Sequence, residues 1–142
     1  MTIRSIFPSE HQIQCAIVEW ANIFTIEKYE QSINGGLILI KRKIIDYLLA
    51  VPNGGNRSIT EALRLKREGV KRGVSDLFFA HPSFGRGFFY HGLWIEVKSK
   101  KGKLRKEQKE WMLFMSNVGY KCVEVRTVDE GIQAIKDYLG MR

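Results

Sequence analysis

The sequence predicts a single mixed α/β domain, residues 1–142, in which α-helices flank a central β-sheet. Segments with apolar residues at helical spacing alternate with short apolar segments of strand character, and glycine- or proline-containing turns separate many of them. The length of 142 residues is typical of one domain with its own hydrophobic core. A hydrophobic fraction of 44% with only 3 prolines argues against a disordered or fibrous chain.

Four segments have the pattern of amphipathic helices. The first opens at a capping box, Ser9 followed by Gln12, and its apolar stripe begins at Ile13. Gly69 is placed to end the second helix. The four helices are expected over residues 10–24, 58–68, 104–117 and 129–139.

Four strands are expected between these helices, at residues 44–51, 76–80, 93–98 and 120–126. Pro52-Asn53-Gly54-Gly55 predicts a turn after the first strand, and the polar segment 26–36 predicts a loop. The second and third strands can pair as a hairpin centred near Arg86. That register places Asp76 opposite Glu96 and keeps the apolar side chains of both strands on one face.

The charge balance favours a polyanionic partner. The chain has 23 Lys+Arg against 15 Asp+Glu, a formal net charge of +8. Charge alone does not separate DNA from RNA or from an anionic membrane surface.

A cytoplasmic protein is expected from the remaining composition. No apolar run is long enough to cross a bilayer, and the N-terminus lacks the pattern of a signal peptide. Cys15 and Cys122 are expected to be reduced core residues, although two cysteines could form one disulfide.

The third expected strand carries the first candidate chemistry. Glu96 and Lys98 share one of its faces, although an isolated E-x-K is usually a solvated strand face. With Asp76 opposite Glu96, the two carboxylates would repel unless a cation joined them, and hard oxygen ligands suit Mg²⁺ or Mn²⁺. A metal there would bind a phosphate and acidify a water that Lys98 orients or deprotonates. The structural alternative is an exposed ion pair of Lys98 with either carboxylate.

Two more polar residues are expected to face the core. Gln108 lies in the middle of an inward stripe of the third helix, and Glu10 lies one turn before Ile13 on the first. Each residue alone is more often a helix cap or a rim residue, but a buried polar group needs partners, and both would point toward the sheet that carries the acidic residues. The stripe around Gln108 consists of Leu104, Trp111, Met115 and Val118.

These residues together resemble the D…(D/E)-x-K core of restriction-endonuclease-like nucleases and, more closely, the virus-type replication-repair nuclease (VRR-NUC) family. The matching segments follow the family order over nearly the whole chain. They are Glu10-x-x-Ile13-Gln14, Pro52-Asn53-Gly54-Gly55, Gly69-Val-Lys-Arg-Gly73-Val-Ser-Asp76-Leu77, Gly92-Leu-Trp-Ile-Glu96-Val-Lys98 and Gln108. One departure is Ser75, where the family more often has proline, which affects the turn more than the chemistry.

The resemblance implies a restriction-endonuclease-like core, Mg²⁺ or Mn²⁺ dependence, and metal ligation by Asp76, Glu96 and the carbonyl of Val97. It implies that Glu10 completes the acidic site, that Lys98 serves the attacking water, and that Gln108 positions Lys98 or the water.

The resemblance also implies a biological setting. Short stand-alone relatives are largely phage-borne, resemble Holliday-junction resolvases and tend to form homodimers. We therefore expect a phage- or prophage-encoded homodimer that acts on branched or junction DNA in replication, recombination or repair, with no membrane partner. The aromatic residues Phe88, Phe89 and Tyr90 in an expected loop are a second hint of dimerisation, although they could equally belong to the core.

Two basic clusters flank the acidic residues and would guide the DNA backbone, although either could be a solvated surface. The candidate DNA-binding residues are Asn53, Arg57, Arg64, Lys66, Arg67, Lys71 and Arg72 before the aspartate, and Lys100, Lys101, Lys103, Arg105 and Lys106 after the lysine.

Two other functions remain open on the sequence. One is a non-catalytic nucleic-acid-binding module of the same fold, and the other is a metal-dependent RNase. A zinc- or histidine-based nuclease is disfavoured, because the three histidines lie on separate elements without ligand spacing.

Overall fold

The computed structural model describes residues 6–52, 57–85 and 87–141, and within them a four-stranded mixed sheet forms the centre of the fold. Its strand order is β3–β4–β7–β8, with β3, β4 and β7 antiparallel and β8 parallel to β7. The strands are β3 (Leu48–Ala50), β4 (Leu77–Phe79), β7 (Leu93–Val97) and β8 (Lys121–Val125). This architecture confirms the predicted α/β fold class.

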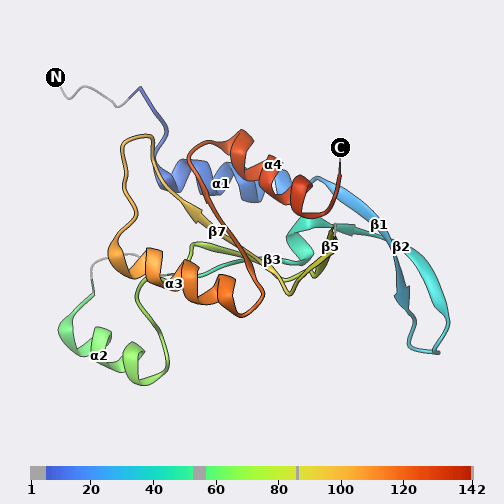
Figure 1. Ribbon diagram of the computed structural model, residues 1–142, viewed down its shortest axis with the longest axis horizontal. Coiled ribbons are helices and arrows are strands. Elements are labelled where there is room, and N and C mark those ends of the chain that lie inside the picture. The colour runs from blue at the N-terminus through green and yellow to red at the C-terminus, as the bar shows by residue number, and fades with distance from the viewer. Residues whose placement is uncertain (1–5, 53–56, 86, 142) are drawn as a thin grey trace.

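Helices cover both faces of the sheet. Figure 1 shows α1 (Glu10–Ala21) and α4 (Val128–Tyr138) together on one side, with α3 (Lys106–Asn117) on the other. Helices α1 and α4 pack on the apolar face of the sheet through the buried side chains of Ile13, Ile17 and Ile135. The core that results is formed by Ile13, Ile17, Ala21, Ile44, Leu48, Leu77, Phe79, Leu93, Ile95, Val97, Val125, Ile135 and Tyr138.

The predicted hairpin register is confirmed. Leu77 pairs with Ile95 and Phe79 with Leu93, so the apolar residues of β4 and β7 share the buried face. The connection contains a second small hairpin, β5 (Ser83–Gly85) with β6 (Phe88–Tyr90). There Ser83 pairs with Tyr90, one residue out of step with the β4–β7 register.

The prediction of a loop over residues 26–36 was wrong. Strand β1 (Thr25–Gln31) pairs with β2 (Leu37–Lys43) in a long antiparallel hairpin, seen at the right of Figure 1. Glu30 holds the two strands together, because it accepts hydrogen bonds from Arg42 at 2.7 and 3.0 Å and from Tyr47 at 3.2 Å. The half-buried face of β1 therefore carries the polar residues Lys28 and Glu30, which leaves no apolar alternation for the sequence to reveal.

Several predicted boundaries were also wrong. The first helix ends at Ala21 rather than near residue 24, because the Asn22 side chain donates to the Val18 carbonyl at 3.0 Å and caps the helix. The expected strand over 44–51 divides into a 3-10 turn, η1 (Ile44–Asp46), and the short β3.

Two expected core positions lie at the surface. Val118 is 48% exposed, because it follows the last residue of α3. Both cysteines are free, and Cys15 is exposed on α1 rather than buried. Over residues 6–52, 57–85 and 87–141, no helix is long and apolar enough to cross a membrane.

Helix α2 (Ile59–Arg67) stands apart from the core. Ser58 caps it by accepting a hydrogen bond from the Glu61 amide at 3.1 Å, but none of its residues is buried. Figure 1 shows it at the lower left, below α3. Helix α2 therefore forms part of the surface and adds nothing to the hydrophobic core.

Candidate active site

Strand β7 carries Glu96 and ends next to Lys98 on the sheet face that α3 covers. Glu96 is 1% exposed and Lys98 is 7% exposed, so the interpretation of an E-x-K segment on a solvated face is wrong. The main-chain amide of Lys98 donates to the Val125 carbonyl at 2.9 Å, which extends the pairing with β8 beyond Val97. Parallel and antiparallel neighbours thus hold this segment on both sides.

Asp76 comes directly before β4 and, by continuation of the β4–β7 register, lies opposite Glu96. Its Oδ2 accepts a hydrogen bond from the Val97 amide at 2.8 Å, and its own carbonyl accepts one from Val51 at 2.8 Å. The side chain is therefore fixed against β7 at the point where Glu96 and Lys98 face α3.

Burial and mutual repulsion make the two carboxyl groups hard to ionise. Burial, followed by repulsion from Asp76, raises the pKa of Glu96 to about 8, whereas the nearby Lys98 acts in the opposite direction. Burial also raises the pKa of Asp76. Lys98 Nζ lies 3.6 Å from Glu96 Oε1. One ammonium group beside the buried Glu96 and the half-buried Asp76 leaves the cluster short of positive charge.

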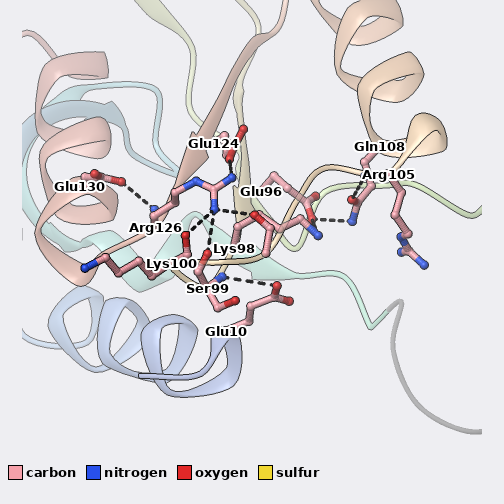
Figure 2. A network of polar contacts seen from close by, with 11 residues as sticks. Glu10, Glu96, Lys98, Ser99, Lys100, Arg105, Gln108, Glu124, Arg126 and Glu130 are labelled. Carbon is pink, nitrogen blue, oxygen red and sulfur yellow. Dashed lines mark hydrogen bonds and ion pairs between the residues drawn. The ribbon is translucent and has the colours of Figure 1, made fainter. Parts of the chain in front are cut away.

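Gln108 connects α3 to this cluster. Its Nε2 donates to Glu96 Oε1 at 2.8 Å, and its Oε1 accepts from the Arg105 amide at 2.8 Å (Figure 2). The second contact caps α3 and explains why the helix begins at Lys106 rather than at Leu104. The predicted inward orientation of Gln108 is confirmed, since the residue is 5% exposed.

The remaining oxygen of Glu96 marks the place for a cation. Glu96 Oε2 is buried and has no hydrogen-bond partner, a costly state for a carboxylate. Carboxylate oxygens are the donors that Mg²⁺ and Mn²⁺ prefer, so Asp76 and Glu96 fit such an ion by their chemistry. Ligation by these residues and by the Val97 carbonyl remains a prediction.

Glu10 lies at the edge of the cluster rather than inside it. It is exposed in the first turn of α1, and its Oε1 accepts from the Ser99 amide at 3.4 Å (Figure 2). Its charge also contributes to the raised pKa values of Asp76 and Glu96. In the described part of the chain, no three His, Cys, Asp or Glu side chains gather closely enough to hold a metal, so Glu10 does not complete a preformed set.

Most of the candidate DNA-binding residues lie at the surface. Asn53 lies outside the described residues. Arg57 is engaged with the Pro52 carbonyl at 2.9 Å, and Lys106 lies 3.7 Å from Glu110. The exposed members are Arg64, Lys66 and Arg67 on α2, Lys71 and Arg72 after it, and Lys100, Lys101, Lys103, Arg105 and Lys106 between β7 and the start of α3.

Arg126 is a residue near the site that the sequence reasoning missed. Its guanidinium binds main-chain carbonyls of the turn that follows Lys98 (Figure 2). Main-chain acceptors leave no mark on the sequence, so neither charge pattern nor spacing distinguishes this arginine from a surface residue.

Gly73 controls how closely the chain before Asp76 approaches α3. Its φ is +83°, and a Cβ there would lie 2.5 Å from the Glu107 carbonyl oxygen. We expect Gly73→Ala to reduce the free energy of unfolding by about 3 kcal/mol, combining left-handed strain with overpacking. Gly69→Ala is the matched control, because φ is +96° but the space around it is open. It should cost only about 1 kcal/mol in urea denaturation, and equal losses would rule out the contact with α3 as the cause.

The mixed sheet, its flanking helices and the acidic pair beside a buried lysine define a restriction-endonuclease-like fold. The VRR-NUC domain model matches residues 8–129, and the chain therefore belongs to the VRR-NUC family of nucleases.

A solved structure described as a "VRR_NUC domain protein" is similar to this chain, with a TM-score of 0.70 and 26% sequence identity. The match covers 94% of this chain and 90% of that one. No curated protein matches the sequence. The resemblance predicted from the motifs is thus confirmed at the level of family and fold.

Proposed function

We propose that this protein is a divalent-metal-dependent nuclease that hydrolyses phosphodiester bonds in DNA, with Mg²⁺ or Mn²⁺ as its cofactor. The observation that carries the proposal is the buried Glu96 carboxylate, which faces Asp76 and keeps one oxygen without a partner. A carboxylate with a purely structural role in this position would destabilise the fold, because no bound cation would offset the cost of its burial.

Asp76 and Glu96 would hold the cation, with the Val97 carbonyl and Glu10 as further ligands. A divalent cation bound there would supply positive charge to the scissile phosphate and acidify a water. Lys98, beside Glu96, would orient that water through its ammonium group, or accept a proton from it after first releasing its own, while Gln108 keeps the Glu96 carboxylate in place. The water oxygen would attack phosphorus as the bond to the leaving oxygen breaks, leaving a phosphomonoester on one product and a hydroxyl on the other.

The exposed basic residues around the site support DNA as the polymer that is bound. In the sequence they stand before Asp76 and after Lys98, and the net charge of +8 favours contacts with phosphate groups. The fold and charge are compatible with a phage- or prophage-encoded enzyme that acts in the bacterial cytoplasm on branched or four-way-junction DNA during replication, recombination or repair.

We further propose a homodimer, which would present two active sites to a branched substrate. Its support is the aromatic surface of the β5–β6 hairpin, where Phe84, Phe88 and Phe89 are exposed. Light scattering of the purified chain over a range of concentrations measures this directly. A monomer at all concentrations would rule the dimer out.

The decisive test is cleavage of labelled linear, flapped and four-way-junction DNA in Mg²⁺, Mn²⁺ or EDTA. Wild type is compared with Glu96→Ala and with Arg42→Ala, a change on the remote β1–β2 hairpin. Cleavage that needs metal, that Glu96→Ala abolishes and that Arg42→Ala preserves would support the nuclease.

The same assay separates the alternatives. DNA binding without cleavage in any metal would point to a non-catalytic binding module. Faster cleavage of matched RNA than of DNA would point to an RNase.

Gln108→Leu tests the residue that holds Glu96. Leucine keeps the volume but removes both hydrogen bonds, so Glu96 is free to turn away from the cation. We expect cleavage to fall about 10- to 100-fold, as for other residues that orient metal ligands. Higher Mg²⁺ should recover part of the rate, and an Mg²⁺ titration of initial rates measures this. An unchanged rate at every Mg²⁺ concentration would show that Gln108 serves α3 alone.

A further inference from the structure

Arg126 lies just after β8 and donates hydrogen bonds to main-chain carbonyls of a neighbouring turn. Its Nη1 donates to the carbonyls of Ser99 at 2.8 Å and Gly102 at 2.6 Å, and it lies 3.3 Å from that of Lys100. Nη2 forms an ion pair with Glu124, which fixes the other edge of the guanidinium. Figure 2 shows the side chain crossing from β8 to this turn.

The turn of residues 99–102 begins directly after Lys98. It closes with a hydrogen bond from the Gly102 amide to the Ser99 carbonyl at 3.1 Å. The Ser99 carbonyl therefore accepts hydrogen bonds from both the Gly102 amide and Arg126 Nη1. Several carbonyl oxygens that converge on one point repel one another. The guanidinium contacts all three carbonyls through Nη1 while Nη2 pairs with Glu124, and a lysine ammonium, with its single nitrogen, cannot occupy both places.

The turn also determines where Glu10 reaches the acidic cluster. The Ser99 amide donates a hydrogen bond to Glu10 Oε1 at 3.4 Å. Gly102 lies beside the same carboxylate, since a Cβ there would be 3.1 Å from Glu10 Oε1 and 3.0 Å from Ser99 Oγ. A shift of the turn in either direction would therefore change the approach of Glu10 to Asp76 and Glu96.

The same turn forms one wall of a groove of about 790 Å³, and the start of α1 forms the other. Lys100 lies over the Phe7 ring, 4.0 Å from its centroid, and Lys101 lines the groove beside it. The turn thus places two lysines next to Glu10, at the edge of the acidic cluster. The groove is lined by Phe7, Pro8, Ser9, Glu10, His11, Gln12, Ser99, Lys100 and Lys101.

We propose that Arg126 is a positioning residue for this site. It holds the 99–102 turn so that Glu10 joins Asp76 and Glu96 around the cation while Lys100 and Lys101 face the DNA backbone. This inference rests on the proposed function. Without Arg126, the carbonyls lose their shared donor, the turn relaxes, and both cation affinity and substrate affinity fall while Asp76, Glu96 and Lys98 stay in place.

The test compares Arg126→Ala and Arg126→Lys with Arg42→Ala, which removes another ion-paired arginine on the remote hairpin. The first readout is binding of Mn²⁺ alone, measured by the loss of free-ion electron paramagnetic resonance signal. Arg126→Ala should weaken binding about 10- to 100-fold, Arg126→Lys should recover little of it, and Arg42→Ala should leave it unchanged. The second readout is the Mg²⁺ concentration at half-maximal cleavage together with KM for DNA, both of which should rise.

Guanidinium chloride at millimolar, non-denaturing concentration should restore part of the Mn²⁺ affinity of Arg126→Ala but not alter wild type. A general loss of structure would not respond in this way. If Arg126→Ala does not fold, Gly102→Ala replaces it, because the added Cβ moves the turn from Glu10 while keeping Arg126. The same weakening of Mn²⁺ binding is expected.

The outcomes separate this inference from the proposed function. Wild type that neither binds Mn²⁺ nor cleaves DNA contradicts the nuclease itself. Wild type that does both, with unchanged Mn²⁺ binding, half-maximal Mg²⁺ and KM in Arg126→Ala or in Gly102→Ala, contradicts the role of Arg126 and leaves the nuclease standing.

Discussion

Glu96→Gln is expected to abolish cleavage and, at the same time, to stabilise the metal-free protein. Glutamine keeps an oxygen for the hydrogen bond from Gln108 but cannot ligate a cation as a carboxylate does. It also removes one of two carboxyls that repel each other and leaves Lys98 to pair with Asp76. We expect the free energy of unfolding to rise by about 2 kcal/mol at pH 8, or several degrees in Tm.

The pH dependence of stability checks the cause of this gain. Because the pKa of Glu96 rises from 4.5 in the unfolded chain to about 8 in the folded one, the folded state binds more protons between these values. Stability of the metal-free wild type should therefore decrease as pH rises from 4.5 to 8, and Glu96→Gln should flatten this slope. Urea denaturation in EDTA at several pH values measures it. Equal slopes in the two proteins would show that folding does not raise the pKa of Glu96.

Lys98→Met is expected to lose cleavage as well but to change stability in the opposite direction. Methionine keeps the buried apolar stem and removes the ammonium that lies 3.6 Å from Glu96. Cleavage should fall by about three orders of magnitude, the range of a lost proton-transfer group. The metal-free protein should lose about 2 kcal/mol of stability near neutral pH, because the buried Glu96 and the half-buried Asp76 then have no cation beside them.

Added Mg²⁺ distinguishes these two effects of Lys98→Met. It should restore the stability of the variant by replacing the missing charge, yet leave cleavage impaired. Thermal denaturation with and without Mg²⁺, beside cleavage rates under the same conditions, provides the comparison. Cleavage within tenfold of wild type would remove Lys98 from the chemistry and assign it a structural role only.

The centre of the fold could be predicted because two patterns agree on one register. The apolar residues Leu77 and Phe79 must share the buried face with Leu93 and Ile95, and among the registers that allow this, the observed one also places Asp76 opposite Glu96. A slip of one residue would expose the apolar residues of one strand and bury its polar ones.

The β1–β2 hairpin could not be predicted in this way. The half-buried face of β1 carries Lys28 and Glu30 after Ile26, and Glu30 is satisfied there by Arg42, so β1 lacks the apolar alternation of a half-buried strand. Arg126 was missed for a related reason, since its main contacts are with backbone carbonyls. Glu10 was expected to point inward, yet it lies exposed and reaches the site only through Ser99.

Because α2 lies apart from the core, its sequence can change more freely during evolution than the sequence of the central sheet. Core residues constrain one another, because a change in one must be matched by its neighbours. The residues of α2 have no such neighbours, since none of them is buried. Its basic surface can therefore change charge, length or orientation with little effect on the sheet that carries Asp76 and Glu96. On the proposed function, selection can change which DNA shapes α2 helps to capture while Asp76, Glu96 and Lys98 stay unchanged.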